Sequence, residues 1–353
     1  MGSEHIAGGG AQSVLCLDVG SGTQDVLYRL PGIALENCPK FVLPSPARLV
    51  AGRIRRLTAR GRAIHLSGVN MGGGFFKAVR EHVQAGLAMS AHPEAALALT
   101  DDPQSITRHG VFLSDACPPG HTPVRLGDYD SGFWEGLLAQ AGLDPPDVIL
   151  ACAQDHGCHP GRSSRQGRFT LWERFLAGTS GRMEGLLYQT PPAELTRLAT
   201  LQRAIGGGPV MDTGPAAALG VLFDKDIEAR IEQEGALIVN MGNSHVLGLL
   251  VHAGRLAGVY EHHTGQVDPL TLAGHLHRFR RGELGSEEVF ATGGHGCMVR
   301  EMSSDFSNTF VIGPRRAELT GIEAEYPAPG GDMMLTGCFG LLKAWEPSVA
   351  FSK

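Results

Sequence analysis

Two segments of the chain share one layout, in which an apolar run meets a glycine turn and a second apolar run follows. The first occupies residues 14–30, with the turn Asp18-Val-Gly-Ser-Gly-Thr, and the second occupies residues 236–252, with the turn Asn240-Met-Gly-Asn-Ser-His. Each predicts two short strands joined by a tight turn. One such hairpin in each half predicts two α/β halves whose glycine turns could face each other across a cleft.

Glycine contributes 49 of the 353 residues, roughly double its usual ~7%, and it gathers at such turns. Successive glycines leave backbone N–H groups free and let an anion approach closely. Thr23 adds a hydroxyl, and Asp18 could hold Mg²⁺ through water. An ordinary hairpin with a glycine turn is the alternative. The candidate nucleotide-binding residues of this first turn are Asp18, Gly20, Ser21, Gly22, Thr23, Gln24 and Asp25.

The second turn offers the corresponding candidates Asn240, Gly242, Asn243 and Ser244. Shortly before it, residues 212–220 predict a helix with an Asp cap, a Pro in the first turn and small residues that would allow a close helix crossing.

Near the C-terminus, Gly337 and Gly340 follow a short apolar run. A strand that enters a helix through glycine suits an adenosine resting on the turn. A simple strand–helix connection is the alternative.

Elsewhere the pattern predicts further elements in the order β-β, irregular, β-α, β-α and then β-β-β-α, β-α. The expected first half is 12–211, the second half 212–353, and residues 1–11 a disordered tail. Residues 31–62 are expected to be irregular and 158–168 a surface loop. The other expected strands are 62–69, 147–153, 255–262, 309–313 and 333–336, and the expected helices are 75–86, 133–141, 169–177, 180–187, 192–204 and 267–280.

Asp155 follows the expected strand 147–153 in the segment Gln154-Asp-His-Gly. Phosphoryl transfer needs a residue that orients the attacking water or hydroxyl, and Asp155 is the first candidate, with Gln154 second. A structural role for Asp155, as the cap of a turn or helix, is the alternative.

The chain holds 15 histidines. Surface or hydrogen-bonded histidines are the simplest interpretation, and a transition-metal site is the sharper one because imidazole suits such ions. His295, in Gly-Gly-His-Gly, and His156 are the candidates for contact with a substrate. The turn at Gly73 and Gly74 is a further candidate anion site before a helix, or else a tight strand–helix contact.

The formal net charge of −6 and the absence of a long basic run argue against nucleic acid or an anionic membrane as a partner. The apolar stretch 236–251 is broken by polar residues, so no membrane span is expected. Seven scattered cysteines make no disulfide framework, and we expect a cytoplasmic protein.

Together the segments 18–25, 212–220, 240–245 and 337–340 resemble the actin/Hsp70/sugar-kinase superfamily of ATP-binding proteins. Its members carry a first phosphate loop, a connecting helix, a second phosphate loop and an adenosine turn in that order. The resemblance implies an α/β fold of two ribonuclease H-like lobes with a nucleotide cleft between them, and ATP and Mg²⁺ as cofactors. Asn240 stands where the superfamily usually has Asp, and it lacks the charge that helps to hold Mg²⁺.

Shorter segments are similar to a bacterial and archaeal family, DUF1786, whose members often carry the label pyruvate formate-lyase activating enzyme-like. These segments are 20–25, 154–157, 293–296 and 329–337. A radical-generating activase needs three cysteines to ligate an iron–sulfur cluster. This chain has no such triplet, so the sequence does not support that chemistry.

Four functions are therefore considered, of which the first two are preferred. The first is a Mg-ATP-dependent phosphotransferase or ATPase, with a small molecule or water as acceptor. The second is a nucleotide-switched protein that regulates or activates a partner, which the uncharged Asn240 favours. The third is a metal-dependent hydrolase that uses the histidines, and a polymerising actin-like scaffold has the least support.

Overall fold

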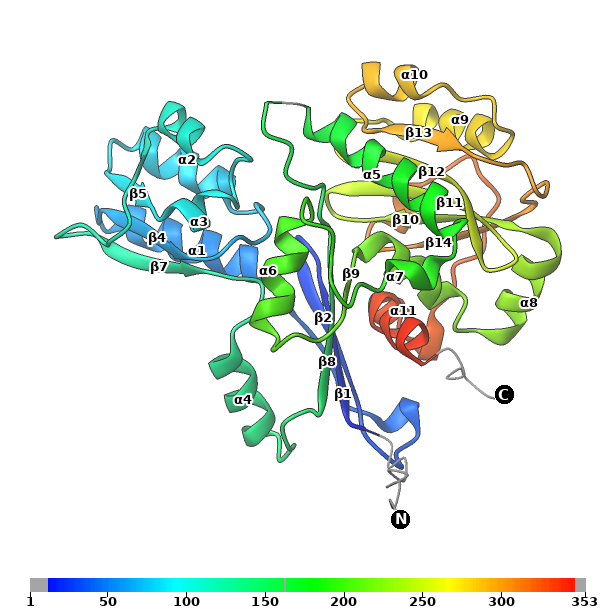
Figure 1. The fold of residues 1–353 in the computed structure, drawn as a ribbon, viewed down its shortest axis with the longest axis horizontal. Coiled ribbons are helices and arrows are strands. Elements are labelled where there is room, and N and C mark those ends of the chain that lie inside the picture. Colours follow the sequence, from blue (N-terminus) through cyan, green and yellow to red (C-terminus); the bar gives the residue numbers. More distant parts are fainter. Residues whose placement is uncertain (1–11, 162, 347–353) are drawn as a thin grey trace, which may run out of the picture.

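The computed structural model of the chain describes residues 12–161 and 163–346, and it is a mixed α/β structure with three sheets (Figure 1). The expected tail 1–11 lies outside the described residues. Two of the sheets have five strands each, and the third has four.

The first sheet has the order β3-β2-β1-β8-β9. Its first three strands form an antiparallel meander, and β8 runs parallel to β1. Its strands are β1 (Val14–Val19), β2 (Thr23–Arg29), β3 (Lys40–Pro44), β8 (Val148–Ala153) and β9 (Val210–Met211).

The second sheet has the order β13-β12-β11-β10-β14, in which β12-β11-β10-β14 repeat β3-β2-β1-β8 and β13 adds an antiparallel edge strand. Its meander begins at β10, and β14 runs parallel to β10 just as β8 runs parallel to β1. Its strands are β10 (Ala236–Met241), β11 (His245–His252), β12 (Arg255–His263), β13 (Gly296–Val299) and β14 (Asn308–Ile312).

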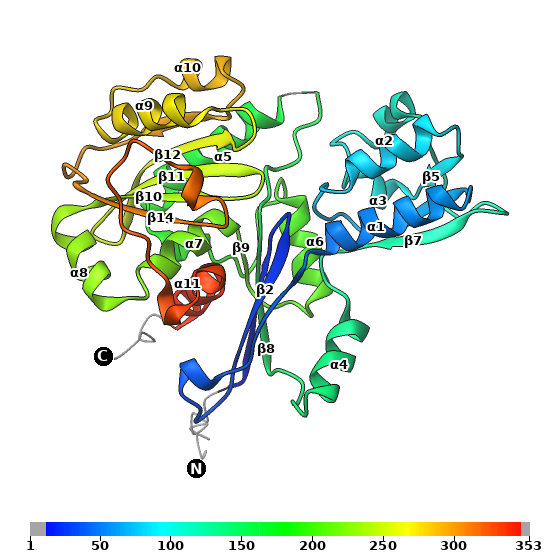
Figure 2. The ribbon, with the colours of Figure 1, turned by 180° about the vertical axis from the view of Figure 1, so that it is seen from behind.

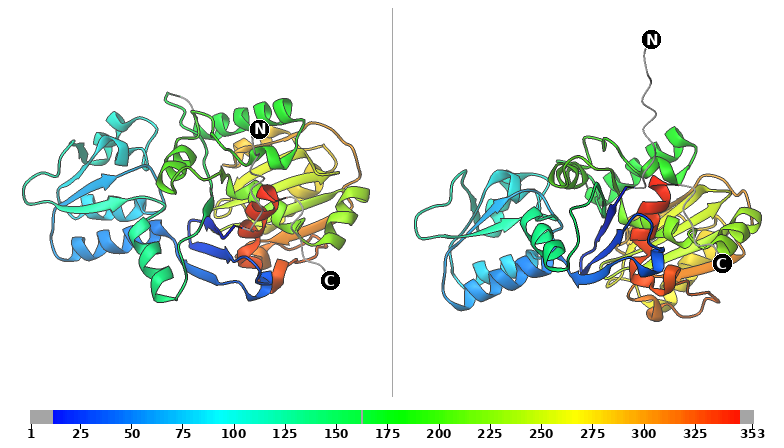
Figure 3. Two further views of the ribbon diagram at one scale, coloured as in Figure 1. Left: turned by 60° about the horizontal axis from the view of Figure 1, so that its bottom comes forward. Right: turned by 90° about the horizontal axis from the view of Figure 1, so that it is seen from below.

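The third sheet, of order β6-β5-β4-β7, is entirely parallel and lies between β3 and β8 in the sequence. It has its own hydrophobic core and forms one end of the molecule in every view (Figures 1–3). Its strands are β4 (Ile64–Gly68), β5 (Met89–Ala91), β6 (Val111–Leu113) and β7 (Thr122–Leu126), and it is accompanied by α1 (Pro46–Ala59), α2 (Phe76–Gln84), α3 (Pro93–Ala96) and the 3₁₀ helix Pro103–His109.

The expectation that 31–62 is irregular is wrong, because this range contains β3 and α1. Ser45 caps α1 by accepting a hydrogen bond from the N–H of Arg48, and Pro46 occupies the first turn, where proline is compatible with a helix. The buried residues of α1 recur at helical spacing, while the arginines lie on its exposed side.

The remaining helices cover the two five-stranded sheets. They are α4 (Ser131–Gln140), α5 (Ser164–Thr179), α6 (Thr196–Ala204), α7 (Thr213–Val221), α8 (Lys225–Glu234), α9 (Pro269–Arg280), α10 (Ser286–Ala291) and α11 (Thr336–Trp345). Short 3₁₀ turns lie at Leu35–Asn37, Met183–Leu186, Arg316–Glu318, Pro329–Gly331 and Met333–Leu335.

These helices and sheets form successive layers. Helices α4 and α6 pack on the outer face of the first sheet, and α9 packs on the outer face of the second. Between the two sheets lie α7 and α11, in one continuous core to which both inner faces contribute (Figure 1). Each five-stranded sheet falls in one of the expected halves, but α5, from residues before 211, contacts β12 and β13 of the second sheet.

The close crossing predicted for the small residues of 212–220 is present between α7 and α11. A Cβ on Gly340 would lie 1.7 Å from the carbonyl oxygen of Ala216, and a Cβ on Gly220 would lie 1.9 Å from that of Thr336. Asp212 caps α7 as predicted, accepting a hydrogen bond from the N–H of Gly214 at 3.0 Å.

Three further expectations are corrected. The expected strand 333–336 is a 3₁₀ turn, because the Asp332 carboxylate accepts a hydrogen bond from the N–H of Met334 and starts the turn into α11. The expected loop 158–168 already contains the start of α5. The expected helix 180–187 is broken by left-handed backbone at Ser180 and Gly181 and keeps one 3₁₀ turn. Over the described residues, no helix combines the length and apolarity that a bilayer crossing requires.

Candidate functional site

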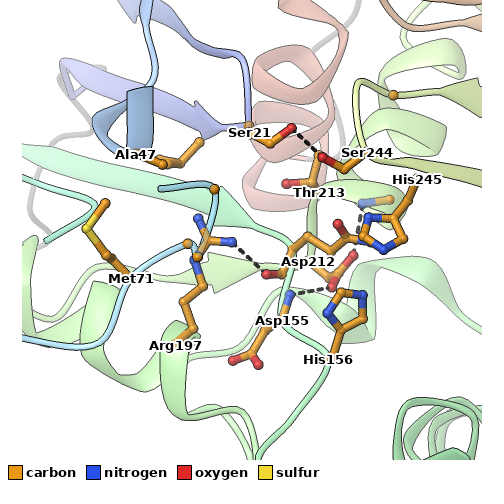
Figure 4. Close-up of a pocket in the computed structure, with 18 of the residues that line it drawn as sticks. Ser21, Ala47, Met71, Asp155, His156, Arg197, Asp212, Thr213, Ser244 and His245 are labelled. Carbon is orange, nitrogen blue, oxygen red and sulfur yellow. Dashed lines mark hydrogen bonds between the residues drawn. The ribbon is translucent and has the colours of Figure 1, made fainter. Parts of the chain in front are cut away.

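A cavity of about 880 Å³ lies where the three sheets meet, and both glycine turns line it (Figure 4). Its walls come from the ends of β1, β8 and β10, from the start of α7 and from the loops of the third sheet.

Strand alternation explains which polar side chains reach the space between the two five-stranded sheets. Side chains two positions apart point to the same face, and Cys16, Cys152, Ile238, Leu247 and Val259 all belong to the core shared by the two inner faces. The polar residues two positions from these are Asp18, Gln154, Asn240, His245 and Glu261.

The two glycine turns have the same backbone geometry and touch each other. The N–H of Gly20 donates to the carbonyl of Thr23 at 3.0 Å, and the N–H of Gly242 donates to that of His245 at 2.9 Å. A Cβ on Gly22 would lie 2.4 Å from the terminal amide nitrogen of the exposed Asn243 side chain, so the two turns approach each other closely here.

The tips of the turns present unpaired backbone donors. Within the described part of the chain, the N–H groups of Ser21, Gly22, Asn243 and Ser244 donate to no protein acceptor. The hydroxyl of Ser244 donates to that of Ser21 at 2.9 Å, so the two sets of donors converge (Figure 4). Converging N–H groups at glycine turns form a concave site for an anion.

Two buried carboxylates lie beside these donors. Asp18 and Asp25 are direct cross-strand partners in β1 and β2. Burial raises the pKa of Asp18 to about 6, although hydrogen bonds from Cys152 and Thr213 act against it. Burial and then the charge of Asp18 raise the pKa of Asp25 to about 8, and Asp25 Oδ1 has no hydrogen-bond partner. Two buried acids that repel each other favour a bound cation.

Asp155 has the geometry of a cap. Its Oδ1 accepts from the N–H of Gly157 and its Oδ2 from the N–H of Leu198, both at 2.9 Å, so it ties the segment after β8 to the first turn of α6. Burial raises its pKa, while these two N–H groups act in the opposite direction. Both carboxylate oxygens are therefore already engaged by the backbone.

Gln154 points across to the second sheet, where its amide donates to Glu261 Oε1 at 2.9 Å. Glu261 is fully buried, and Glu261 Oε2 accepts from Arg168 Nε at 3.0 Å. Arg168 also donates to Asp212 Oδ2 at 2.8 Å. Burial would raise the pKa of Glu261, but the Arg168 guanidinium holds it well below its usual range.

The remaining candidates divide into two groups. Gly73, Gly74 and Gly337 line the cavity, and a Cβ on Gly337 would lie 2.1 Å from the Asp18 carboxylate. Gly340 instead lies in the interface between α7 and α11, where its missing side chain serves helix packing.

Four side chains that are far apart in the sequence converge at one wall of the cavity. His156, His245, His295 and Glu261 each place one potential ligand atom within 4.8 Å of the others. The sequence indicated His156 and His295 singly, but it did not indicate Glu261 or the convergence. The signal in the sequence was that Glu261 and His263 lie two positions apart in β12, where His263 pairs with His245 of β11.

No curated protein matches the chain. Among solved structures, an exopolyphosphatase-like protein aligns over 85% of this chain and 66% of its own, just under two thirds of its length, at 10% identity and a TM-score of 0.29. A family described as "Putative pyruvate format-lyase activating enzyme (DUF1786)" matches residues 71–318. Because this match spans more than half of the sequence and includes most of the cavity wall, the chain belongs to the DUF1786 family.

Proposed function

We propose that this protein binds a nucleoside triphosphate, with its phosphates between the two glycine turns, and transfers or hydrolyses the terminal phosphoryl group. The observation that carries the proposal is the pairing of the turns, whose unpaired N–H groups at Ser21, Gly22, Asn243 and Ser244 converge. The four-stranded pattern that the two sheets share, β3-β2-β1-β8 and β12-β11-β10-β14, supports two ribonuclease H-like lobes related by this pairing.

The phosphate-binding donors would be joined by Thr23 on β2 and by the small residues Gly20 and Gly242. The sequence candidate Gln24 does not line the cavity, because it shares the outer face of β2 with Val26 and Tyr28. The base and ribose would lie toward the wall formed by Gly313, Met333 and Gly337, which extends the cavity beyond the second turn. This wall is formed largely by backbone and thioether groups, which suits the flat face of a base.

The carboxylates of Asp18 and Asp25 fit a Mg²⁺ ion, because Asp25 Oδ1 is buried without a partner and burial raises the pKa of both acids. When bound, Mg²⁺ would neutralise charge that develops on the phosphates. Asn240, which lines the same cavity, would contribute an amide oxygen without charge. Asp18 would be the principal contact to the ion, through water.

We assign Asp155 to positioning, since both of its oxygens accept backbone hydrogen bonds. Gln154 and His156, its neighbours, would lie closer to an acceptor molecule or water held near Gly73 and Gly74. The acceptor end of the cavity is therefore the part formed jointly with the third sheet.

The chemistry named in the family description has no donor set here. A radical-generating iron–sulfur cluster requires three thiolates. Among the described residues, the converging group of potential metal ligands consists of three histidines and a glutamate, and burial raises the pKa of the Cys16, Cys152 and Cys338 thiols.

The proposal is tested by thermal unfolding and calorimetry of the full chain with Mg-ATP, Mg-ADP and a non-hydrolysable ATP analogue. We expect saturable binding with a rise in Tm of several degrees at saturation (~2–4 °C per kcal/mol). Phosphate release that needs no acceptor indicates an ATPase, and binding without turnover indicates the nucleotide-switch alternative. The absence of any response to nucleotides would contradict the proposal.

A further inference from the structure

Three imidazoles and one carboxylate converge at the cavity wall, from elements that no short motif joins. His156 follows β8, His245 begins β11, Glu261 lies in β12 and His295 directly precedes β13. We propose that His156, His245, His295 and Glu261 form a binding site for one divalent transition-metal ion of the Zn²⁺ or Fe²⁺ type.

The distances suit one shared ion. Ligands at ~2.1 Å from a tetrahedral ion lie roughly 3.4 Å apart, and the four potential ligand atoms here lie within 4.8 Å of one another. His156 Nε2 is 3.5 Å from Glu261 Oε1. Small side-chain rotations are therefore sufficient to bring the four atoms to a single centre.

The hydrogen bonding of these histidines sets them apart from the other buried ones. Both ring nitrogens of His245 and of His295, and Nε2 of His156, are buried with no hydrogen-bond partner. By contrast, the other buried histidines each have a partner: His65 pairs with Ser90, His82 with Thr58, His262 with Thr292 and His275 with Tyr260. A buried polar atom without a partner destabilises the fold, and a metal ion would use these lone pairs.

The protonation states already suit metal binding. Burial lowers the pKa of His245 to about 2 and that of His295 to about 3, so both rings are neutral at pH 7. Arg168 keeps Glu261 ionised. Metal ligands must be deprotonated, and His245, His295 and Glu261 have no proton to lose at neutral pH. Three imidazoles with one carboxylate favour Zn²⁺ or Fe²⁺ over Mg²⁺ or Ca²⁺.

The surroundings hold the ligands in place. Gln154 and Arg168 donate to the two oxygens of Glu261, which fixes the orientation of the carboxylate. A Cβ on Gly294 would lie 2.4 Å from the His262 ring, so the position before His295 has room only for glycine. Such outer contacts orient ligands at metal sites.

The site faces the cavity, since His156 and His245 also line it. The backbone carbonyl of His245 accepts the hydrogen bond from the N–H of Gly242 within the second glycine turn. An ion with these four protein ligands could bind a water or an oxyanion of the substrate by expanding to five-coordination. This site is separate from the Asp18 and Asp25 carboxylates, and it does not depend on nucleotide binding.

The test is metal uptake by the full chain without nucleotide. Chelator-treated protein is dialysed against Zn²⁺, or anaerobically against Fe²⁺, and the bound metal is measured by mass spectrometry. We expect about one equivalent in the wild type. His295→Ala and His245→Ala should each weaken metal binding by more than about 100-fold, which exceeds the loss typical of removing a contact outside the ligand set. Neither ring makes a hydrogen bond in the metal-free protein, so the loss would reflect a missing ligand. His65→Asn, at a buried histidine of the third sheet that pairs with Ser90, should retain the metal.

A second measurement covers the case in which a variant does not fold. X-ray absorption of the metal-loaded wild type should show imidazole nitrogen and oxygen around the ion and no sulfur. Failure of the wild type to take up either metal would overturn the site, as would a sulfur-ligated ion or full occupancy in folded His295→Ala. None of these outcomes depends on whether ATP binds.

Discussion

Ser244 donates its hydroxyl hydrogen to the hydroxyl oxygen of Ser21 across 2.9 Å, although 223 residues separate the two. The contact joins the tips of two turns that carry the same backbone hydrogen bond, at Gly20 and at Gly242. Any change in the relative position of the two five-stranded sheets would alter it. The contact therefore reports on closure of the cavity at its phosphate end.

Gly22→Ala should weaken nucleotide binding, because the new Cβ would lie 2.4 Å from the Asn243 amide nitrogen and displace that side chain at the tip of the second turn. We expect a loss of about tenfold or more, equivalent to at least ~1.4 kcal/mol, in the affinity for Mg-ATP measured by calorimetry. Gly265→Ala is the matched control, since a Cβ there meets nothing within 4 Å. Equal affinities of the two variants for Mg-ATP would contradict a role of the turn contact in nucleotide binding.

Asp25→Asn should stabilise the nucleotide-free protein at alkaline pH. The folded-state pKa of Asp25, about 8, lies above the ordinary value of 3.8, so its contribution to stability is complete below pH 4 and is lost as the pH rises toward 8. Urea unfolding in the presence of a chelator should show the variant gaining about 1–3 kcal/mol over the wild type between pH 5 and pH 8.5. Addition of Mg²⁺ at pH 8 should stabilise the wild type more than the variant. A pH-independent difference between the two proteins would contradict the assignment.

Arg168→Met should destabilise the protein by about 3–5 kcal/mol, because it leaves the carboxylates of Asp212 and Glu261 buried without their cation. Arg174→Met on the same helix removes the exposed pair with Glu194 and should cost less than about 1 kcal/mol. Denaturant unfolding at pH 7 compares the two variants. Similar losses in both would show that the buried network contributes little.

Gly340→Ala should destabilise the crossing of α7 and α11, where the Cβ would lie 1.7 Å from the Ala216 carbonyl oxygen. Overpacking of this kind costs roughly 1–3 kcal/mol or more. Gly136→Ala, in α4 with open space around it, should instead stabilise by about 0.5–1 kcal/mol. Thermal unfolding of both variants checks the contrast, and an unchanged Tm for Gly340→Ala would show that the helices can separate at little cost.

The sequence pattern identified the hairpins, the Asp212 cap and the small-residue helix because each depends on local residues. It missed the third sheet, since the strands at 89–91 and 111–113 are too short to show a period. Nor could it show that both oxygens of Asp155 are held by backbone N–H groups, one of them from Leu198, 43 residues away.

The sequence could not predict the group of three histidines and Glu261 for a different reason. Its members span residues 156 to 295. The strand register of the second sheet brings His245, Glu261 and His295 together, and His156 joins them from the segment after β8 of the first sheet. The proposed phosphate and metal sites thus depend on two kinds of information. Local turns are visible in the sequence, whereas contacts between distant strand ends are visible only in the structure.

The most direct test of the central claim is a crystal structure of the full chain with Mg²⁺ and a non-hydrolysable ATP analogue. The account predicts phosphate density between the turns at Gly20–Thr23 and Gly242–His245, with the backbone N–H groups of Ser21 and Ser244 donating to phosphate oxygens. Density for the analogue elsewhere, or an unchanged Ser21–Ser244 contact with no ligand between the turns at saturating concentration, would contradict it.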